Sequence, residues 1–274
     1  MMKKVVLITG ASSGIGKETA LLLIKQGFIV YGAARRLDKM QDLKEAGVHL
    51  LQMDVTEDAS MVKGVHEIID NEKRIDILVN NAGYGSYGAL EDVPMTEAKY
   101  QFEVNVFGLA RLTQLIIPYM REQKSGKIIN ISSIAGNFGE PHGTWYHSSK
   151  YAVEGLSDCL RMELKQFGIN VVVIQPGLIK TEWNNIAREN LIKVSGHTAY
   201  KDLVNKHAKM LSNADNMGSK PIVIAKVIVK AINSNNPKTR YIAGSGAHPI
   251  LFLKRILTDK MFDKIELSLF RMMK

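Results

Sequence analysis

The chain has 274 residues, 46% hydrophobic and 23% charged, which is enough to bury a sizeable core in one large or two small domains. Its single cysteine, Cys159, excludes an internal disulfide framework and fits a reducing cytoplasm, and we interpret it as a small core residue. The formal net charge of +9 comes from scattered basic residues that match no nucleic-acid motif, so we expect a solvated basic surface with anionic ligands and no nucleic acid.

The N-terminal ten residues contain two lysines and one short apolar run. That run is too short for the apolar region of a signal peptide. Nowhere does the chain approach the roughly 20 consecutive apolar residues of a membrane-spanning helix. We therefore expect a cytoplasmic protein without an integral membrane segment.

Short apolar runs rich in Val, Ile and Leu alternate with helical patterns along the chain. We predict strands within 3–10, 28–35, 48–55, 75–83, 126–133, 169–177 and 239–244. Uninterrupted apolar runs separated by helices are typical of parallel strands buried on both faces. The predicted fold class is α/β: a doubly wound Rossmann fold whose mostly parallel, seven-stranded sheet carries helices on both faces. No linker rich in Pro, Gly or Ser divides the chain, so we predict one domain over residues 1–274.

Two segments of the C-terminal third depart from this alternation. The segment of about 178–217 is polar and helix-prone, as expected of a substrate lid. The segment of about 250–274 is predicted to be an amphipathic helical extension. Its apolar residues recur every four positions: Leu253, Leu257, Met261, Ile265 and Leu269. We expect this stripe to pack on its own domain, and a helix on a membrane surface or a partner is the alternative.

A glycine-rich stretch, TGASSGIG at 9–16, lies between the first predicted strand and helix. Glycines there let backbone N–H groups approach a pyrophosphate, and a helix N-terminus adds a favourable dipole. This position favours dinucleotide binding over an ordinary turn. The TGxxxGxG spacing resembles that of the short-chain dehydrogenase/reductases. The resemblance places these residues at the cofactor: Gly10, Ser12, Ser13, Gly14, Ile15 and Gly16.

The end of the second strand, YGAARR at 31–36, bears on the choice between NAD and NADP. Ala34 stands where NAD-binding Rossmann proteins usually have an acid for the ribose 2′-hydroxyl. A guanidinium can hydrogen-bond a 2′-phosphate, which an acid would repel. Arg35 is therefore predicted to select NADP(H), with Arg36 and Ser12 as weaker candidates. Two solvent-exposed arginines are the alternative interpretation.

Later strands end in motifs that also resemble the family's cofactor contacts. QMDV at 52–55 places Asp54 and Val55 at the adenine, although Asp54 could instead cap the following helix. NNAG at 80–83 resembles a motif in which asparagines brace the sheet and the glycine admits the cofactor ribose, although by itself it indicates a turn. This motif and PGLIKT at 176–181 add Asn81, Ala82, Gly83, Pro176, Gly177 and Thr181 to the predicted cofactor site. Thr181 could alternatively be a helix N-cap.

Tyr146 and Lys150 in TWYHSSK are four residues apart, so on a helix they would share one face. Both side chains titrate near pH 10 when free, so neither alone exchanges protons readily at neutrality. Ser133 precedes Tyr146 by thirteen residues, and Asn105 lies in VNVFG. In this order they match the family's catalytic Ser-Tyr-Lys and the asparagine that joins it.

The resemblance implies interconversion of a carbonyl and a primary or secondary alcohol by hydride transfer. Lys150, as an ammonium, would lower the pKa of Tyr146, so that the phenol can act as general acid or base and also hold the cofactor. Ser133 would hydrogen-bond the substrate oxygen, and Asn105 would support a proton-relaying water. Lys150 would also hold the nicotinamide ribose.

The residues around this motif bear on the substrate. His147 would point away from the site and is predicted to be structural, whereas His142, with Glu140 and Trp145, is predicted to line the substrate pocket. No histidine has metal-ligand spacing, so no metal is predicted. Apolar lid residues, Trp183, Ile186 and Leu191, agree with an apolar substrate, and the motifs are similar to those of steroid and retinol dehydrogenases.

We therefore predict an NADP(H)-dependent oxidoreductase acting on a small-molecule carbonyl or alcohol. The alternative is a non-catalytic NADPH-binding sensor on the same fold. The complete set of four catalytic residues argues against it, because a sensor needs no acid/base tyrosine. The resemblance also implies a homodimer or homotetramer, associated through the helices that carry Asn105 and the Tyr-Lys pair.

Overall fold

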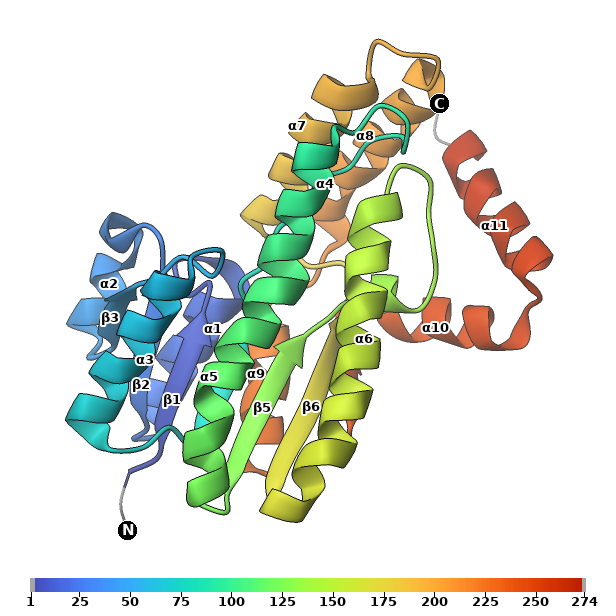
Figure 1. The fold of residues 1–274 in the computed structure, drawn as a ribbon. Helices are drawn as coiled ribbons and strands as arrows, with labels where there is room; N and C mark the ends of the chain where they lie inside the picture. Colours follow the sequence, from blue (N-terminus) through green and yellow to red (C-terminus); the bar gives the residue numbers. More distant parts are fainter. Residues whose placement is uncertain (1–2, 273–274) are drawn as a thin grey trace.

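The seven apolar runs form seven parallel strands of one sheet in the computed structural model, which describes residues 3–272 apart from the side chains of residues 214–216, 271 and 272. The strands are β1 (Val5–Thr9), β2 (Ile29–Ala34), β3 (His49–Gln52), β4 (Ile77–Asn80), β5 (Gly126–Ile131), β6 (Ile169–Pro176) and β7 (Arg240–Ala243). Their order across the sheet is β3-β2-β1-β4-β5-β6-β7 (Figure 1). The predicted fold class is confirmed.

Helices connect the strands and extend beyond the last of them. They are α1 (Gly14–Lys25), α2 (Gln41–Glu45), α3 (Asp58–Glu72), α4 (Met95–Phe102), α5 (Gly108–Glu122), α6 (Thr144–Leu164), α7 (Glu182–Ser195), α8 (Lys201–Met217), α9 (Pro221–Asn233), α10 (Ala247–Ile256) and α11 (Asp259–Met272). Within the described residues, no helix combines the length and the apolar character needed to cross a membrane.

The alternation of side chains along β1 divides the core into two layers. Val6 and Ile8 join a buried cluster that includes residues of α1 and α9. Val5 and Leu7 point to the opposite face and join a cluster that includes residues of α3 and α5. Successive side chains of a strand point to opposite faces, so a continuous apolar run is needed where helices cover both.

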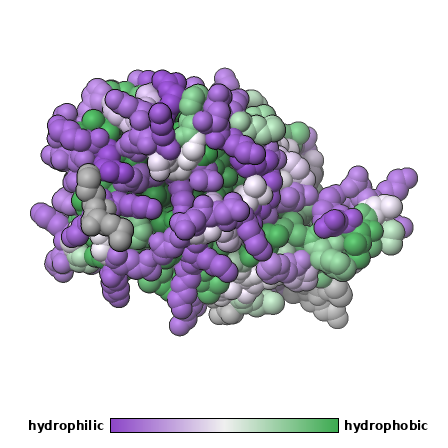
Figure 2. All heavy atoms as spheres, turned by 90° about the horizontal axis from the view of Figure 1, so that it is seen from below, coloured by the Kyte–Doolittle hydropathy of each residue, from purple (hydrophilic) through white to green (hydrophobic). Residues whose placement is uncertain are grey.

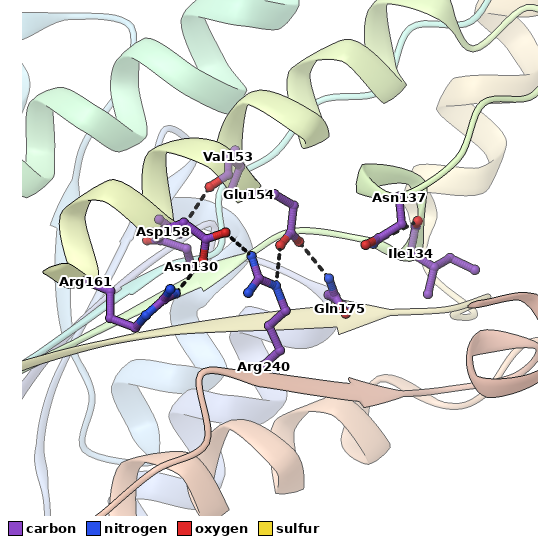
Figure 3. Close-up of polar contacts among 10 residues, drawn as sticks. Asn130, Ile134, Asn137, Val153, Glu154, Asp158, Arg161, Gln175 and Arg240 are labelled. Carbon is purple, nitrogen blue, oxygen red and sulfur yellow. Dashed lines mark hydrogen bonds and ion pairs between the residues drawn. The ribbon is translucent and has the colours of Figure 1, made fainter. Parts of the chain in front are cut away.

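Helix α6 is held against β6 and β7 by an ionic network (Figure 3). Arg240 of β7 donates hydrogen bonds to Glu154 Oε2 at 2.9 Å and to Asp158 Oδ2 at 2.8 Å. Gln175 of β6 donates to the other oxygen of Glu154 at 3.0 Å. Both oxygens of the buried Glu154 carboxylate therefore have donors.

The interpretation of Cys159 as a core residue is wrong, because its side chain is exposed. It shares the outer face of α6 with Tyr151 and Met162, whereas Val153 and Ser157 face inward. Both faces contain small or apolar residues. Helical periodicity alone therefore could not show which of them meets the sheet.

The predicted extension forms two helices, α10 and α11, which we call the C-terminal arm (Figure 1). Phe262 and Phe270 of α11 are buried, and Phe262 packs 5.5 Å from Phe138 between ring centroids. Met261 and Leu269 are 51% and 42% exposed. The expected packing through the four-residue stripe is therefore wrong for α11, which buries a neighbouring face.

Candidate active site

The loop between β1 and α1 has the shape of an anion-binding cradle. Gly10 and Gly14 have φ angles of +65° and +55°, in the left-handed region that glycine adopts without steric cost. A Cβ atom on Gly16 would lie 2.4 Å from the carbonyl oxygen of Gly10, so only glycine allows this close approach. Ser13 is the N-cap residue of α1, and its side chain makes no capping hydrogen bond. The N-terminus of α1 can therefore direct N–H groups at an anion.

The asparagines of NNAG fasten this loop and the sheet behind it. Asn81 Nδ2 donates hydrogen bonds to the carbonyl oxygens of Thr9 at 2.9 Å and Gly10 at 3.1 Å. Asn80 Nδ2 donates to Asn130 Oδ1 at 2.9 Å, between β4 and β5. The loop is thus bonded to the carboxyl end of β4, across the point where the strand order reverses.

Ser133, Tyr146 and Lys150 meet where β5 ends and α6 begins. Ser133 lies just beyond β5 and hydrogen-bonds the Tyr146 side chain. Lys150 lies one turn further along α6, its Nζ 5.9 Å from the centroid of the Tyr146 ring. Lys150 Nζ donates to the carbonyl oxygen of Ile131 at 3.0 Å. The ammonium is thereby fixed between the phenol and the end of the strand.

Asn105 enters the same region from a π-helical turn, Glu103–Phe107, between α4 and α5. Its Nδ2 donates to Ser149 Oγ at 3.0 Å and to the Tyr84 carbonyl oxygen at 2.8 Å. Its Oδ1 accepts from the Tyr84 N–H at 2.8 Å. A Cβ atom on Gly83 would lie 3.7 Å from Asn105 Oδ1 and 4.0 Å from Lys150 Nζ. The structure thus brings all four predicted catalytic residues into one region.

Burial dominates the electrostatics of the tyrosine and lysine. It raises the pKa of Tyr146 to about 12, although the hydrogen bond from Ser133 acts in the opposite direction. The expected lowering by Lys150 is therefore not found in the cofactor-free chain. Burial lowers the pKa of Lys150 from 10.5 to about 8, and the charge of Glu154 opposes this. The lysine is the group placed to titrate near neutrality.

An aromatic wall covers the Tyr146 ring. The ring centroid of Trp183, in the first turn of α7, lies 4.9 Å from that of Tyr146, and Tyr87 lies at 5.6 Å. Leu191 belongs to the same buried cluster. A Cβ atom on Gly85 would lie 2.2 Å from the Trp183 ring, so a glycine is needed beneath the indole. Ile186, the third apolar residue of the predicted lid, is 43% exposed and faces away from this cluster.

The loop before α6 contributes polar groups behind the wall. Glu140 Oε1 accepts a hydrogen bond from Tyr87 at 2.9 Å and lies 3.4 Å from His147 Nε2. His142 Nδ1 lies 3.2 Å from Nδ1 of His207, and both rings are buried. Burial lowers the pKa of His142 to about 4, so this ring is neutral at physiological pH. Trp145, predicted to line the substrate pocket with His142 and Glu140, lies in the first turn of α6 and packs against Phe102 of α4.

A family model described as short chain dehydrogenase matches residues 4–191. The chain belongs to the short-chain dehydrogenase family. It is 38% identical to the 3-ketodihydrosphingosine reductase of Bacteroides thetaiotaomicron, over 89% of each chain. It is 34% identical to the NADPH-dependent 3-dehydrocapnine reductase of Ornithobacterium rhinotracheale, over 94% of each chain.

Solved structures agree with this membership. A short-chain dehydrogenase from Streptomyces avermitilis superposes with a TM-score of 0.80 at 30% identity, covering 99% of this chain and 96% of its own. A serine dehydrogenase complexed with NADP+ superposes with a TM-score of 0.77 at 26% identity, covering 88% and 94%. The chain is therefore a Rossmann-fold oxidoreductase, a dehydrogenase or reductase that uses a nicotinamide cofactor.

In this short-chain dehydrogenase, Arg35 and Asp54, which are predicted to bind the cofactor, lie just after β2 and β3. Arg35 follows β2 with its side chain 62% exposed, and its Nη1 donates to Tyr100 Oη at 2.8 Å. Asp54 lies 4.0 Å from this guanidinium and accepts hydrogen bonds from Thr56. The N-cap of α3 is Glu57, so the alternative of Asp54 as its cap is wrong.

The remaining predicted cofactor residues of this short-chain dehydrogenase lie around the same end of the sheet. Thr181 Cγ2 lies 3.2 Å from where a Cβ on Gly14 would be, so Thr181 sits over the glycine loop. It is also the N-cap residue of α7, although its side chain makes no capping hydrogen bond. Pro176 ends β6, and Gly177 donates its N–H to Ala243 at 2.8 Å. The others lie on the loops after β1, β2, β3 and β4 (Ser12, Arg36, Val55 and Ala82) and in the first turn of α1 (Ile15).

Several residues of the site escaped sequence reasoning. Tyr87 and His207 reach the wall from the loop before α4 and from α8, with ring centroids 5.4 Å apart. Glu154 approaches Lys150 from the next turn of α6. The four-residue spacing of Lys150 and Glu154 was a usable signal. Tyr87 and His207 are 120 positions apart in the sequence, so no local pattern could have identified them.

Proposed function

We propose that the chain is an NADP(H)-dependent reductase that converts an apolar ketone to an alcohol, with Tyr146 as general acid. The observation that carries the proposal is the meeting of Ser133, Tyr146 and Lys150 beside the glycine cradle. A bound nicotinamide cofactor supplies the hydride in this chemistry. The protein must then supply a proton to the substrate oxygen.

In this proposal Tyr146 donates that proton from its hydroxyl, and the Ser133 hydroxyl orients the substrate oxygen. The resulting phenolate is costly in a buried site, because burial already raises the pKa of Tyr146 to about 12. The Lys150 ammonium stabilises it from one helical turn away. Asn105, bonded to Tyr84 and Ser149, holds the backbone around the lysine.

Three observations support NADP(H) over NAD(H). Ala34 ends β2, so no acid stands where it would repel a 2′-phosphate. Arg35 is 62% exposed at that strand end, and its guanidinium is of a type that can hydrogen-bond a phosphate. A relative is named as NADPH-dependent, and a structural neighbour holds NADP+.

We expect Arg35→Asp to lower kcat/KM for NADPH at least about tenfold and to leave that for NADH equal or higher. A wild type that prefers NADH would contradict the assignment.

The substrate is proposed from the wall around Tyr146 and from the relatives. Trp183, Leu191 and Tyr87 present an apolar and aromatic surface at the phenol. Two relatives are named as reductases of 3-ketodihydrosphingosine and 3-dehydrocapnine. Ketones of this type, with 3-ketodihydrosphingosine first, are therefore the compounds to test.

The deciding experiment measures NADPH oxidation against a panel of such ketones, with Tyr146→Phe as the matched variant. We expect turnover by the wild type and a loss of at least about a thousandfold in the variant, with NADPH binding retained. If both proteins bind NADPH and neither turns over any ketone, the chain acts as an NADPH sensor instead.

We also propose self-association through α5 and α6, in keeping with the outward-facing Phe107, Tyr151 and Met162 on or next to these helices. Sedimentation velocity would distinguish a dimer from a tetramer. A monomer at micromolar concentration would contradict this part of the proposal.

A further inference from the structure

The basic residues are not evenly distributed along the chain. Residues 1–177 contain 19 Lys and Arg against 20 Asp and Glu, a formal charge of −1. Residues 178–274 contain 17 against 7, a formal charge of +10. The entire excess of positive charge therefore belongs to the segment that forms α7, α8, α9, β7 and the C-terminal arm.

The arm of this basic segment also exposes large apolar side chains. Phe252 and Ile256, one turn apart on α10, are 62% and 58% exposed. Met261, Ile265 and Leu269 follow at four-residue intervals on α11 and are also exposed. A surface helix normally turns such a stripe toward its core. Here the core contacts of α11 come from Phe262 and Phe270 instead, which leaves the stripe uncovered within the described residues.

Exposed cations accompany these apolar residues. Arg255 lies beside Ile256, Lys260 beside Met261, and Lys264 beside Ile265. Helix α11 also carries two further acids next to these residues, Asp263 and Glu266. The carboxylate of Asp259, at the start of α11, forms an ion pair with Lys254 at 2.6 Å, so each charge partly neutralises the other. Figure 2 shows the arm projecting from the body, with hydrophobic side chains exposed next to hydrophilic ones.

We propose that the C-terminal arm docks on the surface of a membrane that contains anionic lipids. Its exposed apolar residues would enter the headgroup region, and its cations would meet the lipid phosphates. The charge distribution decides between this and a second copy of the chain. Residues 247–274 contain 6 Lys and Arg against 3 Asp and Glu, and residues 178–246 contain 11 against 4, so the arm and the helices before it are both positive. Pairing two arms would bring segments of like charge together, which is unfavourable, whereas an anionic surface is complementary to them.

The docking is independent of the reductase proposal, since it rests on the arm and its charge. The test is co-sedimentation of the full chain with two sets of vesicles: phosphatidylcholine alone, and equal parts of phosphatidylcholine and phosphatidylglycerol. We expect binding to the anionic vesicles only, and its loss at high salt. In the double variant M261E/I265E we expect the partition coefficient to fall at least about tenfold.

A matched control is Met95→Glu on α4, where the methionine is 55% exposed, close to the 51% of Met261. This control should bind vesicles as the wild type does, and circular dichroism should show that all variants are folded. If M261E/I265E does not fold, the variant K260E/K264E tests whether the cations of the arm are needed for binding, since both lysines are exposed. Its binding to anionic vesicles should also fall. Three results would overturn the proposal: no wild-type binding to anionic vesicles, undiminished binding by these variants, or a change in oligomeric state caused by M261E/I265E without vesicles.

Discussion

Replacing Lys150 by methionine should abolish turnover and yet stabilise the cofactor-free protein. Lys150 is 6% exposed, and its burial lowers its pKa from 10.5 to about 8. Such a shift means that folding at neutral pH buries a charge at a cost in free energy. Methionine has a similar length, carries no charge and adapts to irregular space.

The magnitude follows from the pKa shift. A lowering from 10.5 to about 8 corresponds to about 3.5 kcal/mol, at about 1.4 kcal/mol for each pKa unit. The variant also loses the hydrogen bond from Lys150 to the Ile131 carbonyl oxygen, worth roughly 1 kcal/mol. We therefore expect a net gain of about 2.5 kcal/mol in the free energy of unfolding at neutral pH.

The gain should depend on pH in a defined direction. Between the folded pKa of about 8 and the unfolded value of 10.5, the unfolded chain binds more protons, so wild-type stability rises with pH in that window. The advantage of the variant is therefore complete below pH 8 and lost as the pH approaches 10.5.

Urea unfolding without cofactor, at about pH 7 and about pH 9.5, measures both the size and the sign. The exposed Lys165, replaced by methionine, provides a control that should change little at either pH. A Lys150→Met protein less stable than the wild type at pH 7, or equally shifted at both pH values, would refute the reasoning.

Two further predictions concern the wall and the ionic network. Gly85→Ala places a Cβ where the Trp183 ring lies 2.2 Å away, so we expect the indole to move and KM for an apolar ketone to change at least about threefold, while the Kd for NADPH stays the same. An unchanged KM would show that the indole does not contact substrate. Arg240→Leu removes a donor from the buried Glu154, and because the arginine is 32% exposed we expect a loss of about 2 kcal/mol in urea unfolding. An unchanged midpoint would show that the network does not hold α6 to the sheet.

Sequence reasoning succeeded where the chemistry of a position is local. Strand β1 could be predicted because both faces of a central parallel strand must be apolar. The glycines at 10, 14 and 16 could be placed in a tight strand-to-helix turn, where two of them have positive φ and a Cβ on Gly16 would meet the Gly10 carbonyl oxygen. The grouping of Ser133 with Tyr146 and Lys150 came from the resemblance of their order and spacing to the short-chain dehydrogenase motif, and the structure brings the three side chains together.

Predictions from the sequence were wrong where the burial or the pKa of a residue depended on which residues of other elements pack against it. The apolar stripe of α11 was expected in the core, but Phe262 and Phe270 occupy that role because Phe138 and His207 lie opposite them. The pKa of Tyr146 was expected to be lowered by Lys150. Neighbours from other elements, Trp183 among them, bury the phenol instead.

The sequence by itself determined the order of strands and helices, the glycine cradle and the family, because each of these features depends on residues that are close together along the chain. The tertiary structure decided which helix faces are covered and which ionisable groups lose their water. Those outcomes depend on contacts between distant residues such as Glu154 and Arg240, whose separation along the chain carries no periodic signal. Burial and charge at the site are therefore properties of the packed protein.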